Sequence, residues 1–149
     1  MKSLNFSLLL LFIFGSLCAQ DLSVKDLTVE HKKNPVGIDI KQPRFSWKIY
    51  GTGNNIMQTA YSVRVATDQK FSSEKTIWQS GKKMTDESVL ISYEGPALKS
   101  GEKYFWQVKI WDNKGRESKW SEIANWEIGL LSQSDWKAKW IEMERDTNR

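Results

Sequence analysis

Cysteine, histidine and proline are scarce in this chain. Its 149 residues include one Cys, one His and 3 Pro, while 40% are hydrophobic and 27% are charged. One Cys and one His are too few for the three or four nitrogen and sulfur ligands of a typical zinc site. A Ser-His-Asp or Cys-His catalytic centre would have to use His31. The apolar fraction is too high for a disordered chain, and the low Pro and Gly content excludes collagen-like and low-complexity classes.

Long hydrophobic runs are missing beyond the N-terminus. After a basic start, residues 8–14 are all apolar, and small residues follow up to Ala19. This pattern predicts a secretory signal peptide over residues 1–19, too short to remain as a membrane span. A rival interpretation makes Cys18 the lipidated residue of a lipoprotein, although Leu17 stands where a lipobox has a small residue. We therefore expect an exported protein, periplasmic or extracellular, without a membrane span.

Alternation of apolar and polar residues recurs along the rest of the chain. The alternating runs, separated by turns rich in Asn, Gly and Pro, cover residues 45–49, 61–65, 89–91, 104–110 and 124–128, with shorter candidates at 22–30 and 76–79. Alternation with period two is typical of strands that bury one face. Two sheets of such strands must cover each other's apolar faces. The sequence therefore predicts an all-β, antiparallel sandwich of about seven strands over residues 20–131, with no helix of ten or more residues.

The longest alternating run has a distinctive start. Residues 98–103 lead through Ser100-Gly101 into Tyr104 and the strand that follows. This resembles the penultimate strand of a fibronectin type III or immunoglobulin-like module, with Tyr104 as its tyrosine corner. The hydroxyl of such a tyrosine bonds backbone a few residues upstream, and Trp47 would be the core tryptophan. An ordinary β-hairpin that begins with Tyr remains the alternative.

Recognisable catalytic or metal-binding motifs are not found. Asp86-Glu87 is an adjacent acidic pair in a turn-like stretch, and His31 follows a strand end, so we expect both to be solvated. Residues 112–117 lack the acid spacing of an EF-hand and are better interpreted as a hairpin turn. Glycosidases need two carboxylates held across a cleft, and no such pair is indicated. We predict no catalytic residue, no cofactor and no metal.

The basic isoelectric point, about 9.1, does not indicate nucleic-acid binding. After the predicted signal peptide, the basic doublets are Lys32-Lys33 and Lys82-Lys83, and elsewhere Lys and Arg alternate with Asp and Glu. A nucleic-acid surface needs a stripe of one sign. We therefore expect no nucleic-acid partner.

The 8 tryptophans fall into two groups. Trp47, Trp106 and Trp126 occupy inward positions of the predicted strands and are assigned to the core. The other five either line a sugar site or contact a neighbouring domain, and they are Trp78, Trp111, Trp120, Trp136 and Trp140. We favour packing over sugar binding. Trp111 and Trp120 are expected to pack together near the 113–115 turn, while Trp136 and Trp140 begin the next structural unit.

Short motifs follow one another in a characteristic order. They include Asn34-Pro35-Val36-Gly37, Pro43-Arg44-Phe45-Ser46-Trp47, Trp78-Gln79-Ser80-Gly81, Tyr104-Phe105-Trp106, Trp120-Ser121 and Asp135-Trp136-Lys137-Ala138-Lys139-Trp140-Ile141. In this order and over nearly the whole chain after residue 20, the sequence resembles the N-terminal region of bacterial α-L-rhamnosidases of glycoside hydrolase family 78.

The resemblance implies a non-catalytic accessory sandwich of a secreted enzyme. The parent family removes terminal α-L-rhamnose from glycosides by inverting hydrolysis in an (α/α)6 barrel far downstream, and no residue of that barrel lies in these 149 residues. No catalytic residue can therefore be assigned, and the sequence looks like an N-terminal fragment. Residues 132–149 would be a linker and the first strand of a second β domain. Partners would be the remaining domains of the parent glycosidase and rhamnose-containing glycans. The alternative is an independent carbohydrate-binding or adhesion module.

Overall fold

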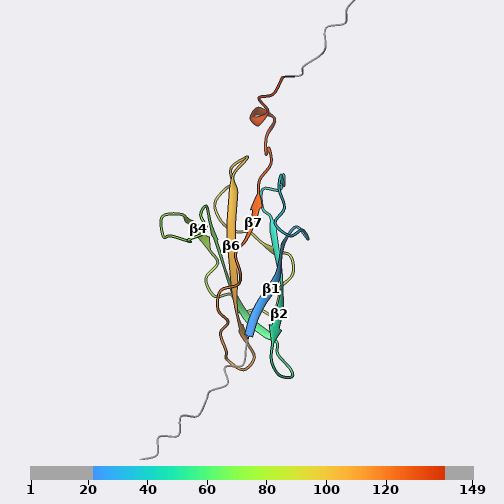
Figure 1. Cartoon of the computed structure of the whole chain (residues 1–149), viewed down its shortest axis with the longest axis vertical. Coiled ribbons are helices and arrows are strands. Elements are labelled where there is room, and N and C mark those ends of the chain that lie inside the picture. The colour runs from blue at the N-terminus through green and yellow to red at the C-terminus, as the bar shows by residue number, and fades with distance from the viewer. Residues whose placement is uncertain (1–21, 140–149) are drawn as a thin grey trace, which may run out of the picture.

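Two antiparallel sheets packed face to face make up the computed structural model, which describes residues 22–139 (Figure 1). The described elements are β1 (Leu22–Val29), β2 (Arg44–Gly51), β3 (Gln58–Ala66), β4 (Thr76–Gln79), β5 (Ile91–Ser92), β6 (Lys103–Asp112), β7 (Ala124–Glu127) and a short 3-10 helix, η1 (Gln133–Asp135). One sheet has the order β1-β2-β5 and the other β4-β3-β6-β7. The predicted all-β sandwich is confirmed. The predicted signal peptide, residues 1–19, lies outside the described residues.

The pairing of β3 with β6 forms the centre of the larger sheet. Val63 lies opposite Val108, and Val65 lies opposite Trp106. All four side chains are fully buried, while the residues between them point to the other face of the sheet. The alternation that predicted these strands is therefore the alternation between the core and the outer face.

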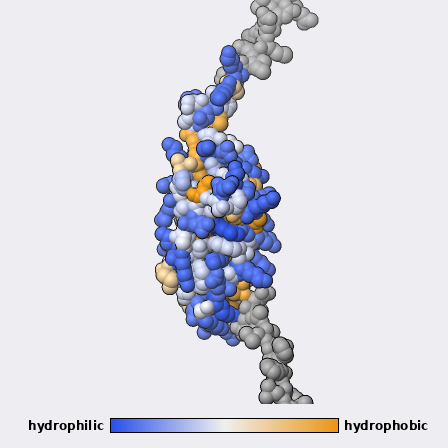
Figure 2. All heavy atoms as spheres, turned by 90° about the vertical axis from the view of Figure 1, so that its left-hand side faces the viewer, coloured by the Kyte–Doolittle hydropathy of each residue, from blue (hydrophilic) through white to orange (hydrophobic). Residues whose placement is uncertain are grey.

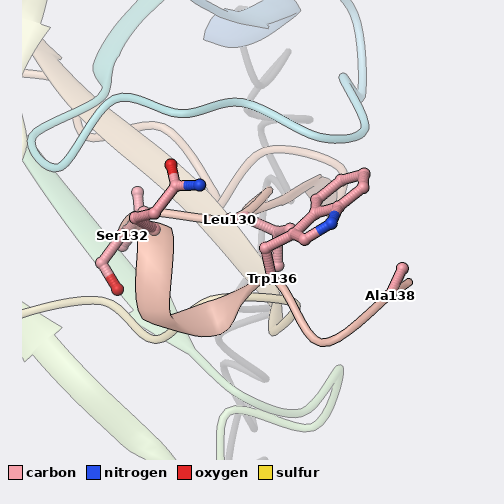
Figure 3. Close-up of a pocket in the computed structure, with 6 residues that line it drawn as sticks. Leu130, Ser132, Trp136 and Ala138 are labelled. Atoms are coloured by element: carbon pink, nitrogen blue, oxygen red, sulfur yellow. The ribbon is translucent and has the colours of Figure 1, made fainter. Parts of the chain in front are cut away.

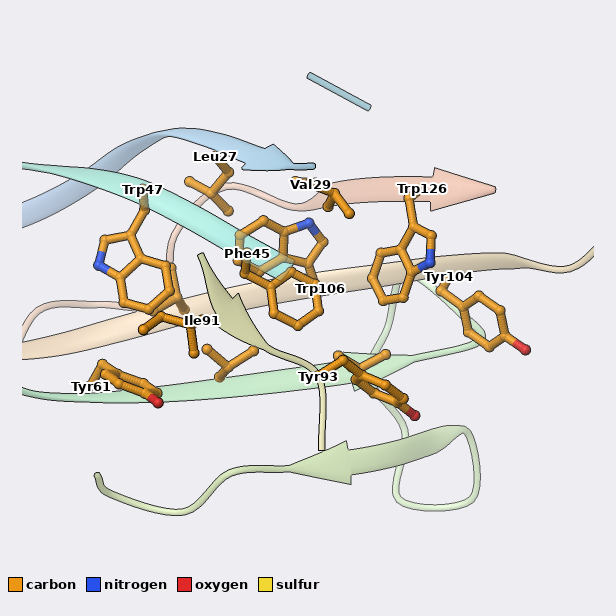
Figure 4. Close-up of a cluster of buried hydrophobic side chains, with 14 of the residues drawn as sticks. Leu27, Val29, Phe45, Trp47, Tyr61, Ile91, Tyr93, Tyr104, Trp106 and Trp126 are labelled. Atoms are coloured by element: carbon orange, nitrogen blue, oxygen red, sulfur yellow. The ribbon is translucent and has the colours of Figure 1, made fainter. Parts of the chain in front are cut away.

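Phe45 of β2 lies at the middle of the aromatic core (Figure 4). Its ring centroid is 4.5 Å from that of Trp106 and 5.4 Å from that of Trp126. Tyr104 stacks on Trp126 at 5.4 Å. Trp47 lies against Tyr61 farther along the sandwich, at 5.2 Å. The assignment of Trp47, Trp106 and Trp126 to the core is confirmed, because all three are buried.

The tyrosine corner is also present. The Tyr104 hydroxyl accepts a hydrogen bond of 2.9 Å from the backbone N–H of Lys99, five residues upstream. Gly101 lies between them with φ of +73°, a conformation that glycine adopts without a Cβ penalty. This turn connects the segment after β5 to the start of β6.

One predicted strand is wrong in its position. Residues 89–91 were expected to alternate, but Val89 is 63% exposed and the strand covers Ile91–Ser92. Leu90 has a positive φ of 56°, which breaks the extended backbone between them. The Leu90 N–H donates to the Ser46 hydroxyl at 2.9 Å instead of joining a regular ladder. The short β5 still pairs with β2 through Phe45 and Ile91.

Candidate functional site

Trp78 lies on β4, at the edge of the larger sheet, and belongs to the rim of the core. Its ring centroid is 5.1 Å from that of Tyr93 and 6.4 Å from that of Phe45, on which it stacks. The side chain is half-buried. Trp78 therefore closes one side of the aromatic cluster and is not a freely presented ring.

Trp111 and Trp120 lie on the outer side of the larger sheet. The ammonium group of Lys109 is 5.0 Å from the centroid of Trp111 and 5.2 Å from that of Trp120. Among the described residues we find no ring-to-ring contact between the two tryptophans. The prediction that the two rings pack on each other is therefore wrong, and each ring instead lies near the ammonium group of Lys109. A second ammonium, from Lys82, lies 4.3 Å from the Trp111 ring.

Arg64 extends this arrangement across β3. Its guanidinium carbon is 4.3 Å from the centroid of Trp120 and 4.4 Å from that of Phe71. The same group donates two hydrogen bonds to the Gln107 side-chain oxygen, at 3.1 and 2.6 Å. Partial burial lowers the pKa of Arg64. We call the six side chains the cation–aromatic array, and in spatial order they are Phe71, Arg64, Trp120, Lys109, Trp111 and Lys82.

Two serines hold Trp120 in the array. The hydroxyl groups of Ser118 and Ser121 accept hydrogen bonds from the β6 N–H groups of Ile110 and Val108, at 3.0 and 3.1 Å. The N–H groups of the two serines donate back to the carbonyls of the same β6 residues, each at 2.9 Å. Residues 118–121 are therefore bonded to β6 at both ends, on either side of Trp120. Sequence reasoning placed the tryptophans here but missed Arg64 and Lys109, since nothing in the local sequence shows which cations lie over a ring.

The array is a poor platform for sugar stacking. A sugar ring needs an open aromatic face, and the faces of Trp111 and Trp120 are already engaged by cations of the same chain. Glu117 fixes the arrangement further, since it accepts bonds from Lys109 at 2.5 Å and from the Trp111 indole N–H at 2.9 Å. The bond from Lys109 holds the pKa of Glu117 below its usual value. The array thus stabilises the outer face of the sheet.

Apolar side chains are exposed around Trp136, where the described chain leaves the sandwich. Leu130 is 45% exposed and Trp136 is 56% exposed. Figure 3 shows both beside a surface hollow lined by Leu130, Leu131, Ser132, Gln133, Trp136 and Ala138. In Figure 2, hydrophobic atoms gather at this end of the molecule. We call Leu130, Trp136 and Ala138 the apolar end. The fifth tryptophan, Trp140, lies outside the described residues.

Two acidic side chains of the described chain, Asp112 and Glu30, stabilise the fold through bonds to arginines. Asp112 is buried, and its carboxylate accepts bonds from the N–H groups of Lys114 and Arg116, at 3.0 and 2.8 Å, and from Arg116 Nε at 2.7 Å. Residues 112–117 therefore form the predicted hairpin turn. Glu30 binds Arg44 through both carboxylate oxygens, and the bond to this guanidinium lowers the pKa of Glu30.

The remaining candidates from the sequence lie at the surface. His31, Asp86 and Glu87 are exposed, as expected. Within residues 22–139, no three His, Cys, Asp or Glu side chains come close enough together to hold a metal ion. The helical structure in that same stretch lacks the length and apolar character that crossing a membrane would require.

Comparisons with known proteins agree with this architecture. The chain is 43% identical over 120 residues to an α-L-rhamnosidase of Streptomyces avermitilis, covering 80% of this chain and 12% of that protein. It is 37% identical over 155 aligned positions to an α-L-rhamnosidase of Formosa agariphila, covering 98% of this chain and 16% of that protein. The chain therefore spans about an eighth to a sixth of the length of these relatives.

Solved structures give the same result. The crystal structure of the Streptomyces avermitilis α-L-rhamnosidase complexed with L-rhamnose matches 81% of this chain and 12% of that chain, with a TM-score of 0.77 and 43% identity. The α-L-rhamnosidase from Dictyoglumus thermophilum matches 83% of this chain and 14% of that chain, with a TM-score of 0.76 and 40% identity. The profile of the Rha78A-like N-terminal immunoglobulin domain matches residues 24–132. The chain thus belongs to the family of Rha78A-like N-terminal immunoglobulin domains.

Proposed function

We propose that this chain is the non-catalytic accessory sandwich of an exported α-L-rhamnosidase, and that it supports the domains that follow it in the parent polypeptide. The observation that carries the proposal is the apolar end, where Leu130 and Trp136 are exposed at the point from which the chain continues. Exposed apolar surface of this kind marks a contact site. The much greater length of the relatives supports a following domain as the partner.

The domain boundaries follow from the same proposal. Residues 20–131 make the sandwich, and residues 132–149 are a linker and the first strand of a second β domain. In support, Ile38 still bridges to Ile128 and Leu131 still packs against the core, whereas residues from Ser132 to Ser134 are exposed. Signal-directed export is proposed from residues 1–19. Mass spectrometry of the exported protein should give the mass of a chain that begins at Gln20. A lipid attached to Cys18 would favour the lipoprotein alternative.

Hydrolysis by the purified chain tests the central claim. We expect no release of nitrophenol from an aryl α-L-rhamnoside above the buffer rate, and release by the longer polypeptide if the gene continues in frame beyond Arg149. Sugar release by the 149-residue chain, abolished by neutralising one of its acids, would refute the proposal. The inactivity is expected because the described carboxylates with buried environments, Asp112 and Glu30, are bonded to Arg116 and Arg44.

Sugar titration separates the proposal from an independent carbohydrate-binding module. Trp fluorescence of the chain should stay constant when rhamnose-containing oligosaccharides are added to millimolar concentrations, because the Trp111 and Trp120 rings are engaged by cations. Quenching at millimolar or lower ligand, lost in Trp111→Ala or Trp120→Ala but retained in Trp136→Ala, would instead establish a sugar site on the array.

A further inference from the structure

The segment that leaves the sandwich is attached to it at two successive points. We call residues 130–136 the exit segment. At the first point Leu131 packs its side chain against the core, and its N–H donates to the Ser100 hydroxyl at 3.0 Å. Immediately before it, the Gly129 N–H donates to the Ile38 carbonyl at 2.8 Å. The chain is thus still bonded to the sandwich after the last strand, β7, has ended.

The second attachment is a clasp between Ser100 and Asp135. The Ser100 hydroxyl donates a 2.5 Å hydrogen bond to one carboxylate oxygen of Asp135, and the Ser132 N–H donates to the same oxygen at 3.1 Å. Ser100 lies in the turn that the tyrosine corner fixes, where the Gly101 N–H also donates to the Ile128 carbonyl at 3.0 Å. The single turn of η1 is therefore tied to a rigid part of the sandwich.

This geometry controls how the apolar end is presented. Trp136 directly follows Asp135, and its N–H donates to the Gln133 carbonyl at 3.2 Å. The clasp therefore fixes the backbone up to the residue that carries the exposed indole, and Leu130 lines the same hollow (Figure 3). A flexible tether would leave the direction of the outgoing chain undefined, whereas two attachment points about four residues apart define it.

We propose that the exit segment is a rigid elbow that sets the orientation of the next domain of the same polypeptide and offers it Leu130 and Trp136 as an apolar docking edge. The choice of occupant rests on the proposed function and on the relatives, of which this chain covers 12–16%. A covalently attached domain has a high effective concentration at this edge, so a small apolar contact suffices to hold it. Pre-ordering of the elbow lowers the entropy lost when that domain docks.

Backbone relaxation of the 149-residue chain tests the elbow itself. Amide order parameters of residues 131–135 should match those of β7, about 0.85, and should fall below about 0.6 in Ser100→Ala and in Asp135→Ala. Ser100→Ala also removes the acceptor of the Leu131 N–H, and Asp135→Ala also removes the acceptor of the Ser132 N–H, so the double variant should have the lowest order parameters of the three. Ser134→Ala is the matched control, because its hydroxyl contacts only the exposed Ser132 hydroxyl. Low order parameters in the unsubstituted chain, or full order in Asp135→Ala, would overturn the elbow.

A fluorine label tests the docking edge separately. With 5-fluorotryptophan incorporated, the resonance missing from Trp136→Phe identifies Trp136, and its shift between H2O and D2O reports solvent contact. We expect a large isotope shift in the 149-residue chain and a several-fold smaller one in the polypeptide extended through the following domain. An unchanged shift in the extended polypeptide would refute docking at Trp136. Because the order parameters are measured without that domain, failure of the elbow and failure of the proposed function give different results.

Discussion

The indole N–H of Trp47 donates a 3.0 Å hydrogen bond to the side-chain oxygen of Gln58 inside the sandwich. The amide nitrogen of Gln58 in turn donates to the backbone carbonyls of Glu87, at 2.7 Å, and Thr85, at 3.3 Å. One buried glutamine thus connects β2, β3 and the segment that leads into β5. All its hydrogen-bonding groups are used, as burial requires.

Replacement of this glutamine should be costly. Gln58→Leu keeps the volume but leaves the Trp47 N–H and the carbonyl of Glu87 without their partners, so we expect a loss of about 2–4 kcal/mol in the free energy of unfolding. Urea denaturation followed by fluorescence measures the loss. Gln79→Leu, at an exposed position of β4, is the control and should stay within about 0.5 kcal/mol of the parent. Equal stabilities of the two variants would show that the buried network contributes nothing.

Sequence patterns predicted the sheets well because alternation directly reflects burial. The expected strand at 76–79 coincides with β4, and the tyrosine corner predicted at Tyr104 is present. Leu90 shows where the pattern fails, because a positive φ in an apolar stretch depends on Ser46 of a distant strand, which bonds its N–H. Local sequence does not carry that information.

The polar contacts between distant residues could not be predicted from the sequence, because they too depend on which segments the fold brings together. Gln58 is bonded to Trp47 across two strands, and Arg64 lies over Trp120, which comes much later in the chain. Only the fold brings these groups together. The exposed Trp136 was expected from its place beyond the last predicted strand, but the clasp between Ser100 and Asp135 was not, since it joins a turn to a segment of no regular pattern.

The tyrosine corner should make a measurable contribution to stability. Tyr104→Phe keeps the ring stacked on Trp126 but leaves the Lys99 N–H without its acceptor, and we expect a loss of about 1 kcal/mol by denaturant unfolding. Tyr50→Phe is a matched control, because the Tyr50 hydroxyl bonds Asp26 at the surface. An equal loss in both variants would mean that the corner is no stronger than a surface contact.

Asp112 should contribute to the loss of stability at acid pH. Burial opposes its ionisation, but the bonds from Arg116 and from the backbone outweigh this and lower the pKa of Asp112 below 3.8. A carboxyl group whose pKa is lower in the folded state stabilises the fold above its unfolded pKa, and this stabilisation is lost as the pH falls through the folded value. The parent should therefore lose stability below about pH 4, and Asp112→Asn should lose less over that range while being less stable at pH 7. Thermal unfolding between pH 2 and 7 measures both effects, with the exposed Asp86→Asn as control. Parallel curves for the parent and Asp112→Asn would contradict the assignment.

Tyr93 presents the opposite case to Tyr104. Its hydroxyl is buried and has no hydrogen-bond partner among residues 22–139, and a Cβ added at Gly95 would lie only 2.4 Å from it. Loss of this hydroxyl should therefore cost nothing, so we expect Tyr93→Phe to match or exceed the parent at pH 7, in contrast to Tyr104→Phe.

The burial of the Tyr93 hydroxyl should also make the stability of the fold depend on pH in the alkaline range. Burial raises the pKa of Tyr93 to about 12, from an ordinary value of 10.0. A phenol whose pKa is higher in the folded state stabilises the fold fully below the unfolded pKa, and this contribution is lost as the pH rises through the folded value. The parent should therefore lose stability between about pH 10 and 12, and Tyr93→Phe should lose less over the same interval. Urea midpoints measured from pH 8 to 12 test this. If the midpoint of Tyr93→Phe falls in parallel with that of the parent, the Tyr93 hydroxyl ionises as readily in the folded chain as in the unfolded one.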